Sequence, residues 1–205
     1  MERGIAVRQG LNFLRAELPA ILAKRTDVLS PRMLHIIEDL AGDWRRLDER
    51  IEALSDEIMT LAREDKSCER LMTVPGIGPI ISSATVAAIG TGDVFSKGRD
   101  FEAWLGLVPE QISTGDRTIL GPISRRGNRY LRSLFIQAAW AVLTKIKPEG
   151  WERYGLKSWI ESAKQRLHRN LLAIALANKL ARIAWAVLHK GRVFECVKTN
   201  APRPA

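Results

Sequence analysis

Cysteine is scarce in this chain. The 205 residues include only Cys68 and Cys196, which are far apart and do not have the spacing of metal ligands. Neither a disulfide framework nor a zinc site is therefore indicated. The first ten residues, MERGIAVRQG, also lack the apolar core of a secretory signal. This composition favours a protein of the reducing cytoplasm.

Long uninterrupted apolar runs are missing as well. The most apolar stretch, LLAIALANKLARIAWAVL, is interrupted by Asn178, Lys179 and Arg182. We therefore expect no membrane-spanning segment and no membrane partner.

Common catalytic signatures are absent. His35, His168 and His189 are scattered, and none has a second histidine or cysteine at metal-ligand spacing. There is no phosphate-binding loop of the Walker type, and Gly76 and Gly78 follow a helical pattern and not the strand that a dinucleotide fingerprint requires. The residues themselves indicate no cofactor.

Positive charge is present, and it is unevenly distributed. The net charge is +9, but residues 1–70 carry a net charge of −2 and residues 71–205 carry +11. A basic surface favours nucleic acid because binding releases condensed counterions. Charge alone leaves open whether the basic residues only promote solubility.

The apolar pattern predicts an all-α, mainly helical fold in two parts, residues 1–70 and residues 71–205. After Ser30 and Pro31, a plausible helix start, apolar residues recur every three or four positions. This heptad seam consists of Ile37, Leu40, Trp44, Leu47, Ile51, Leu54, Ile58 and Leu61. The pattern predicts either an antiparallel helix hairpin with residues 11–24 or a coiled coil with a second chain, because both bury the same stripe.

Residues 71–90 read LMTVPGIGPIISSATVAAIG, which predicts a helix-hairpin-helix element. Gly76 and Gly78 would let backbone N–H groups approach a DNA phosphate, because glycine has no Cβ to block the approach. The alternative is a tight turn between two helices, with Ile77 and Ile81 in the core.

A polar loop is expected at residues 110–122, between two well-patterned helices. It contains the hydroxyl groups of Ser113 and Thr114, followed by Arg117. Such a loop can present a reactive side chain on a rigid scaffold. The alternative is an ordinary turn in which both hydroxyls bond to nearby backbone.

The next segment, SRRGNRYLR, predicts a helix with Ser124 as its N-cap. An apolar stripe from Leu131 to Val142 would leave Arg125, Arg129 and Arg132 near one another on a different side, with Arg126 beside them. Guanidinium groups next to a hydroxyl loop can bind a phosphodiester. A last long helix is expected at roughly residues 159–190, with a basic edge at Lys164, Arg166 and Arg169.

These motifs, in the order VPGIGP, GLVPEQISTGDRTILG and SRRGNRYLR, resemble the C-terminal domain of the insertion-sequence 110 family of bacterial transposases. Residues 71–143 are similar to that domain, and residues 30–70 are similar to the coiled-coil linker that precedes it. The resemblance implies a serine-dependent DNA recombinase whose nucleophile forms a covalent phosphoserine link. It implies DNA as a partner, an element-encoded guide RNA, and either a homo-oligomer or association with a full-length transposase, in the bacterial cytoplasm.

Two departures from the family pattern affect this expectation. The family's N-terminal RuvC-like domain, whose four acidic residues bind divalent metal, is not found in this sequence, so we interpret the chain as a truncated copy with no cofactor of its own. The family serine usually comes directly before the loop glycine, where this chain has Thr114, with Ser113 one position earlier. Ser113 is the less hindered candidate, because threonine carries an extra methyl group.

Three functions follow from these observations. The chain could be a catalytic recombinase fragment, a non-catalytic module that binds DNA or RNA through the hairpin and the arginines, or a coiled-coil assembly partner of a full-length transposase.

Overall fold

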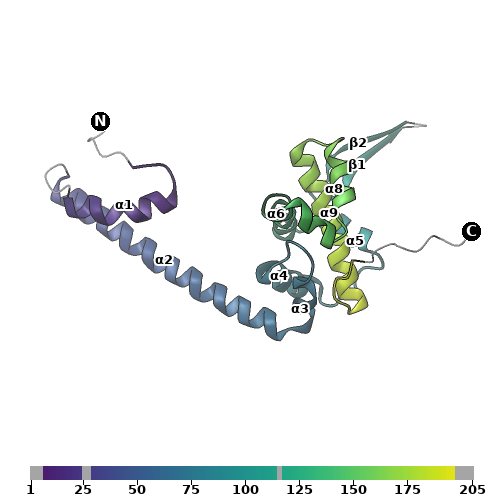
Figure 1. Ribbon diagram of the computed structural model, residues 1–205, viewed down its shortest axis with the longest axis horizontal. Coiled ribbons are helices and arrows are strands. Elements are labelled where there is room, and N and C mark those ends of the chain that lie inside the picture. The colour runs from purple at the N-terminus through teal and green to yellow at the C-terminus, as the bar shows by residue number, and fades with distance from the viewer. Residues whose placement is uncertain (1–6, 25–28, 115–116, 197–205) are drawn as a thin grey trace, which may run out of the picture. The chain divides into compact units, whose positions relative to one another are not determined.

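The described residues, 7–24, 29–114 and 117–196 of a computed structural model, form nine helices and one two-stranded sheet (Figure 1). The predicted mainly helical fold is thereby confirmed. The chain divides into two compact units, Met1–Asp56 and Glu57–Ala205, whereas the sequence had suggested a boundary after Arg70. Helix α2 continues through the boundary between the units.

The first unit contains α1 (Leu11–Lys24) and most of α2 (Pro31–Glu64). The hydroxyl oxygen of Ser30 accepts a hydrogen bond from the N–H of Met33 at 3.3 Å, as a capping residue should. Arg15 of α1 forms an ion pair with Asp48 and lies 5.5 Å from the centroid of the Trp44 ring. These contacts place α1 beside the first half of α2.

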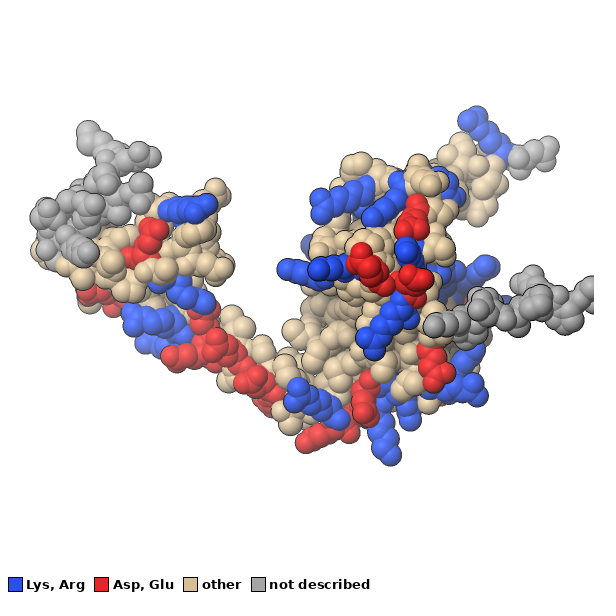
Figure 2. Space-filling model, viewed as in Figure 1, with Lys and Arg blue, Asp and Glu red and all other residues tan. Residues whose placement is uncertain are grey.

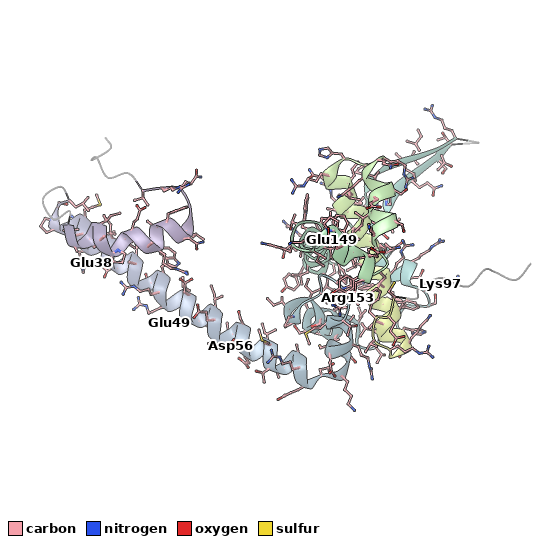
Figure 3. All side chains as sticks on the ribbon, viewed as in Figure 1. Glu38, Glu49, Asp56, Lys97, Glu149 and Arg153 are labelled. Carbon is pink, nitrogen blue, oxygen red and sulfur yellow. The ribbon has the colours of Figure 1, made fainter. Side chains whose placement is uncertain are left out.

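Most of the heptad seam on α2 is solvent-exposed. Leu40, Leu47 and Ile51 are 62%, 58% and 61% exposed. Acidic and basic side chains are mixed along the same helix (Figure 2), and the acidic ones include Glu38, Glu49 and Asp56 (Figure 3). Helix α1 therefore contacts α2 without covering the seam, and a coiled coil with a second chain stays a prediction.

The second unit is built around the long helix α9 (Arg169–Lys190), which packs against α3, α5, α6 and α8. The other helices of the unit are α3 (Lys66–Met72), α4 (Pro79–Ile89), α5 (Gly98–Trp104), α6 (Arg129–Lys145), α7 (Pro148–Arg153) and α8 (Lys157–Lys164). Leu176, Leu180 and Ala184 of α9 are fully buried. Among the described residues, α9 alone is long and apolar enough to cross a membrane, and its apolar side chains form the core of this unit.

The single long helix expected at residues 159–190 is wrong. The chain leaves α8 at Lys164 and begins α9 at Arg169. His168 caps α9, its Nδ1 accepting a hydrogen bond from the N–H of Asn170 at 3.4 Å. The apolar pattern continues through the break, so periodicity alone did not reveal it.

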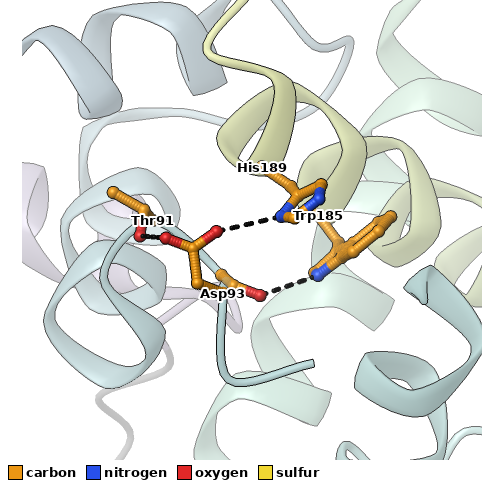
Figure 4. Close-up of polar contacts among 5 residues, drawn as sticks. Thr91, Asp93, Trp185 and His189 are labelled. Carbon is orange, nitrogen blue, oxygen red and sulfur yellow. Dashed lines mark hydrogen bonds and ion pairs between the residues drawn. The ribbon is translucent and has the colours of Figure 1, made fainter. Parts of the chain in front are cut away.

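The C-terminal end of α9 is tied to the turn that follows α4 (Figure 4). The indole N–H of Trp185 donates to the carbonyl oxygen of Gly92 at 3.0 Å. The Nδ1 of His189 lies 3.0 Å from Asp93 Oδ1, and Asp93 Oδ2 accepts from the Thr91 hydroxyl at 2.6 Å. The hydrogen bonds from Thr91 and His189 lower the pKa of Asp93, with the Thr91 bond contributing most. The Trp185–Gly92 and His189–Asp93 contacts join parts of the chain that are more than ninety residues apart.

Candidate functional site

The segment expected as a polar loop is a β-hairpin. Strand β1 (Pro109–Thr114) pairs antiparallel with β2 (Arg117–Ile123), and the hairpin extends beyond the helices of its unit (Figure 1). The sequence contains a signal for it that the loop prediction missed. Gly115–Asp116 stands between runs rich in β-branched residues, and a glycine-led pair is typical of a two-residue hairpin turn. Residues 115 and 116 lie outside the described chain.

The two candidate nucleophiles point to opposite faces of the hairpin. Ser113 pairs with Thr118, and Thr114 pairs with Arg117. Successive side chains of a strand alternate between faces, while cross-strand partners share one. Ser113 therefore lies on one face with Thr118, and Thr114 lies on the other with Arg117. A ligand that lies on one face of the hairpin can contact only one of the two hydroxyls.

Ser113 has a polar neighbour on its own face that the sequence did not single out. The side-chain amide of Gln111 donates a hydrogen bond to the Ser113 Oγ at 2.9 Å. All of β1 is exposed, so the Ser113 hydroxyl is open to solvent and to a ligand.

The base of the hairpin is held rigidly by the segment after β2. The N–H of Ser124 donates to the carbonyl of Val108 at 2.9 Å, and the N–H of Arg125 donates to the carbonyl of Gly106 at 3.2 Å. Gly127 has a φ of 82° and lies against the Trp104 carbonyl. Backbone hydrogen bonds and this close approach therefore join the end of α5 to residues 124–128. The hairpin and α6 both start from this segment.

Helix α6 begins later than the sequence suggested. Asn128 is its N-cap, and its side-chain oxygen accepts from the N–H of Leu131 at 3.0 Å. The expected cap at Ser124 is wrong, because residues 124–128 donate backbone hydrogen bonds to carbonyls of residues 104–108 and Arg125 has a positive φ of 54°. Arg125 and Arg126 consequently lie in the segment before the helix.

Of the four arginines expected at this helix start, Arg125, Arg126 and Arg129 are exposed. Arg132 is only 9% exposed, and its Nη1 donates to the carbonyls of Leu105 at 2.9 Å and Arg126 at 3.2 Å. The expectation that Arg132 lies with Arg129 on the surface is corrected, because Arg132 satisfies backbone oxygens inside the fold. The remaining three arginines and Arg117 are available to an anionic ligand.

The glycine turn at residues 73–78 joins α3 to α4. Gly76 has a φ of 82°, and a Cβ there would lie 2.5 Å from the carbonyl oxygen of Ala138 in α6. Ile77 and Ile81 are 5% and 9% exposed. Gly76 is therefore required for packing, whereas the space beside Gly78 at the start of α4 is open.

A metal site is not formed by the described residues. Within residues 7–24, 29–114 and 117–196, no group of three or more His, Cys, Asp or Glu side chains gathers as metal ligands.

Comparison with known proteins shows the family to which this region is similar. Residues 68–155, which include the glycine turn, the hairpin and α6, match the model of the IS116/IS110/IS902 transposase family. The chain belongs to this family.

Relatives from three bacteria agree with this assignment. A probable family 20 transposase of Pseudomonas aeruginosa is 40% identical over 91% of the chain. The transposase of insertion sequence element IS1328 from Yersinia enterocolitica is 37% identical over 95%, and that of IS1111A from Coxiella burnetii is 33% identical over 95%. The chain covers 54%, 54% and 53% of these relatives, so it spans about half of their length.

Proposed function

We propose that this chain provides the DNA-binding and strand-exchanging surface of an insertion-sequence transposase. The observation that supports the proposal is the exposed hydroxyl of Ser113 on a hairpin whose base is fixed beside Arg125, Arg126 and Arg129. A nucleophile and the groups that bind a phosphodiester thus start from one rigid segment.

The proposed reaction is a transesterification. The Ser113 oxygen attacks phosphorus and a phosphoserine bond forms, while the bond from phosphorus to a deoxyribose oxygen breaks. The serine proton passes to solvent, and the departing sugar oxygen takes up a proton. The guanidinium groups at the hairpin base bind phosphates farther along the same strand, because Ser113 lies five strand residues, roughly 17 Å, from that base. A second attack by a sugar hydroxyl reverses the chemistry on a new strand.

Ser113 is preferred to Thr114 for two physical reasons. Its hydroxyl carries no neighbouring methyl group, and the Gln111 amide at 2.9 Å fixes the direction of its oxygen. Thr114 occupies the position where the family usually has its serine, so it is the alternative nucleophile on the other face.

A matched pair of variants tests the proposal. The chain is incubated with DNA from the element that encodes it, and covalent protein–DNA adducts are separated under denaturing conditions. An adduct that is lost in Ser113→Ala and kept in Thr114→Ala supports Ser113, and the reverse result assigns the chemistry to Thr114. If no adduct forms when the remaining half of a relative and the element's RNA are supplied, the catalytic proposal is wrong.

A second candidate function is nucleic-acid holding without chemistry. Three exposed arginines in a five-residue stretch suit phosphates of DNA or of a guide RNA. This function predicts binding that weakens in Arg125→Ala with Arg129→Ala and is unaffected by Ser113→Ala. Duplex DNA and structured RNA, measured side by side, distinguish the two partners.

A further inference from the structure

A groove separate from the hairpin lies at the opposite end of α6. It has a volume of about 440 Å³, and it is lined by Leu143 and Thr144 of α6 and by Lys164, Leu167, Arg169 and Leu172 from the α8–α9 corner. Its floor is apolar, two of its lining residues are cationic, and none is acidic. The proposed function uses none of these residues.

Aromatic rings hold the two cations at the groove. The Arg169 guanidinium lies 4.8 Å from the centroid of Trp140, and the Lys164 Nζ lies 4.4 Å from that of Trp151. A guanidinium that stacks on a ring has a second planar face, and such a plane is a common platform for an unpaired base. Arg166 and His168, both exposed, add donors to the connection between the helices.

The dimensions and chemistry of the groove fit a nucleotide better than a duplex. Sites for small molecules usually have volumes of roughly 300–1,000 Å³, with mostly apolar walls and a few placed polar groups. Bases in a duplex are stacked and paired, so a side-chain groove cannot take one up unless it is unpaired. The apolar leucine side chains can pack against the face of a base, and the positive charge of Lys164 can bind its phosphate.

We propose that this groove binds one unpaired nucleotide of single-stranded DNA. The base lies against the leucines and the plane of Arg169, and the adjoining phosphate lies at Lys164. DNA is the occupant because the inference rests on the proposed function, in which strand exchange separates DNA strands. Arg129 and Thr144 are fifteen residues apart on α6, about 22 Å along the helix. A strand of roughly six stacked nucleotides, at about 3.4 Å each, spans that distance.

The test uses the full chain and a decathymidylate that carries one 5-iododeoxyuridine. Irradiation should cross-link the base to residues 140–144 or 164–172, identified by mass spectrometry of the peptides. In parallel, fluorescence anisotropy measures the affinity for the unmodified strand. We expect Arg169→Ala to weaken binding about tenfold, as the loss of one stacking contact would, and Arg169→Lys, which keeps the charge, to weaken it less.

Arg153→Ala is the matched control. Arg153 lies on α7 (Figure 3), outside the groove, with its guanidinium 6.0 Å from the Tyr154 ring. It should change the affinity less than about twofold, and all three variants should unfold at the same temperature because these side chains are exposed. An equal loss in Arg153→Ala, or cross-links confined to other peptides, would overturn the proposal.

Two further ligands test the occupant itself. A decamer of abasic deoxyribose phosphates should bind more weakly than decathymidylate, and equal binding would mean that the groove reads only phosphate. Decauridylate RNA should bind no more tightly than decathymidylate; tighter binding would overturn the assignment to DNA. Loss of groove binding with the Ser113 adduct intact removes only this inference, whereas intact groove binding without an adduct removes only the hairpin chemistry.

Discussion

The carbonyl oxygen of Trp104 occupies the space that a side chain at Gly127 would need. A Cβ built on Gly127 would lie 1.8 Å from that oxygen, and the φ of Gly127 is 82°. This approach holds residues 124–128 against the end of α5. It thereby fixes both the hairpin base and the exposed arginines.

Replacement of Gly127 should therefore damage the fold. We expect Gly127→Ala to lower the free energy of unfolding by about 2 kcal/mol or more, because the backbone conformation is strained for alanine and the carbonyl must move. Gly121→Ala is the control, since its Cβ would lie 3.6 Å from the Glu110 carbonyl, an ordinary contact. Urea denaturation measures both, and equal stability of the two variants would show that the contact is not rigid.

Arg132 should contribute to stability and not to ligand binding. Arg132→Met leaves the carbonyls of Leu105 and Arg126 without this donor, and we expect a loss of roughly 2–4 kcal/mol. Arg129→Met, at an exposed position on the same helix, should cost less than about 0.5 kcal/mol. A stable Arg132→Met variant with weakened DNA binding would contradict the buried role.

The exposed arginines should make DNA binding depend on salt, and the slope of this dependence gives the number of phosphate contacts. Each phosphate contact contributes a slope of about −0.9 to the logarithm of the affinity against the logarithm of the salt concentration for duplex DNA. Arg125→Ala with Arg129→Ala should therefore reduce the slope by about 2. Titrations at several salt concentrations measure it. Lys97→Ala, on the N-cap of α5 (Figure 3), is the control, and an unchanged slope in the double variant would place the DNA elsewhere.

The exposed seam on α2 predicts self-association. Leu47→Lys with Ile51→Lys should convert an oligomer to a monomer in sedimentation equilibrium, because two charges would replace apolar contacts. Glu49→Gln changes a charge between these seam positions and should leave the assembly intact. A wild-type chain that sediments as a monomer at high concentration would refute the coiled coil between chains.

Ionisation of Glu102 should make the fold less stable as the pH rises above the ordinary pKa of a glutamate. Burial raises the pKa of Glu102 above its usual value near 4.5, although Arg182 and Arg99 oppose this; the Arg182 Nε lies 3.0 Å from Glu102 Oε2. The folded state then binds its proton more tightly than the unfolded state, so stability falls as the carboxyl ionises. Glu102→Gln should remove this fall. Melting temperatures of both proteins between pH 4 and pH 7 test this prediction. If the wild type became more stable relative to Glu102→Gln as the pH rises, the prediction would be wrong.

The sequence predicted the helical elements well where apolar spacing controls the structure. The run from Ser30 through α2 and the stripe from Leu131 to Val142 both follow a helical period, and both form helices with the expected caps or buried faces. The hairpin was missed because most residues of its two strands are exposed, so the strands carry little apolar alternation. Only the Gly115–Asp116 pair and the β-branched residues around it indicated a turn between strands.

Contacts between distant segments account for the other differences. The start of α6 depends on the approach of Gly127 to Trp104, and the burial of Arg132 depends on a carbonyl twenty-seven residues earlier. No local pattern encodes either contact. The sequence therefore predicted neither the start of α6 nor which of the four arginines reach the surface.

The register of the hairpin has a consequence for how such a site can change in evolution. Pairing shifts by one residue between Pro109 and Gln111, so β2 contains one more residue than β1 near the fixed base. Deletion of Glu110 would move every later residue of β1 by one place and bring Thr114 to the face that Ser113 now occupies. Chain length alone can therefore decide which hydroxyl lies on a given face of the hairpin, without any change in either side chain.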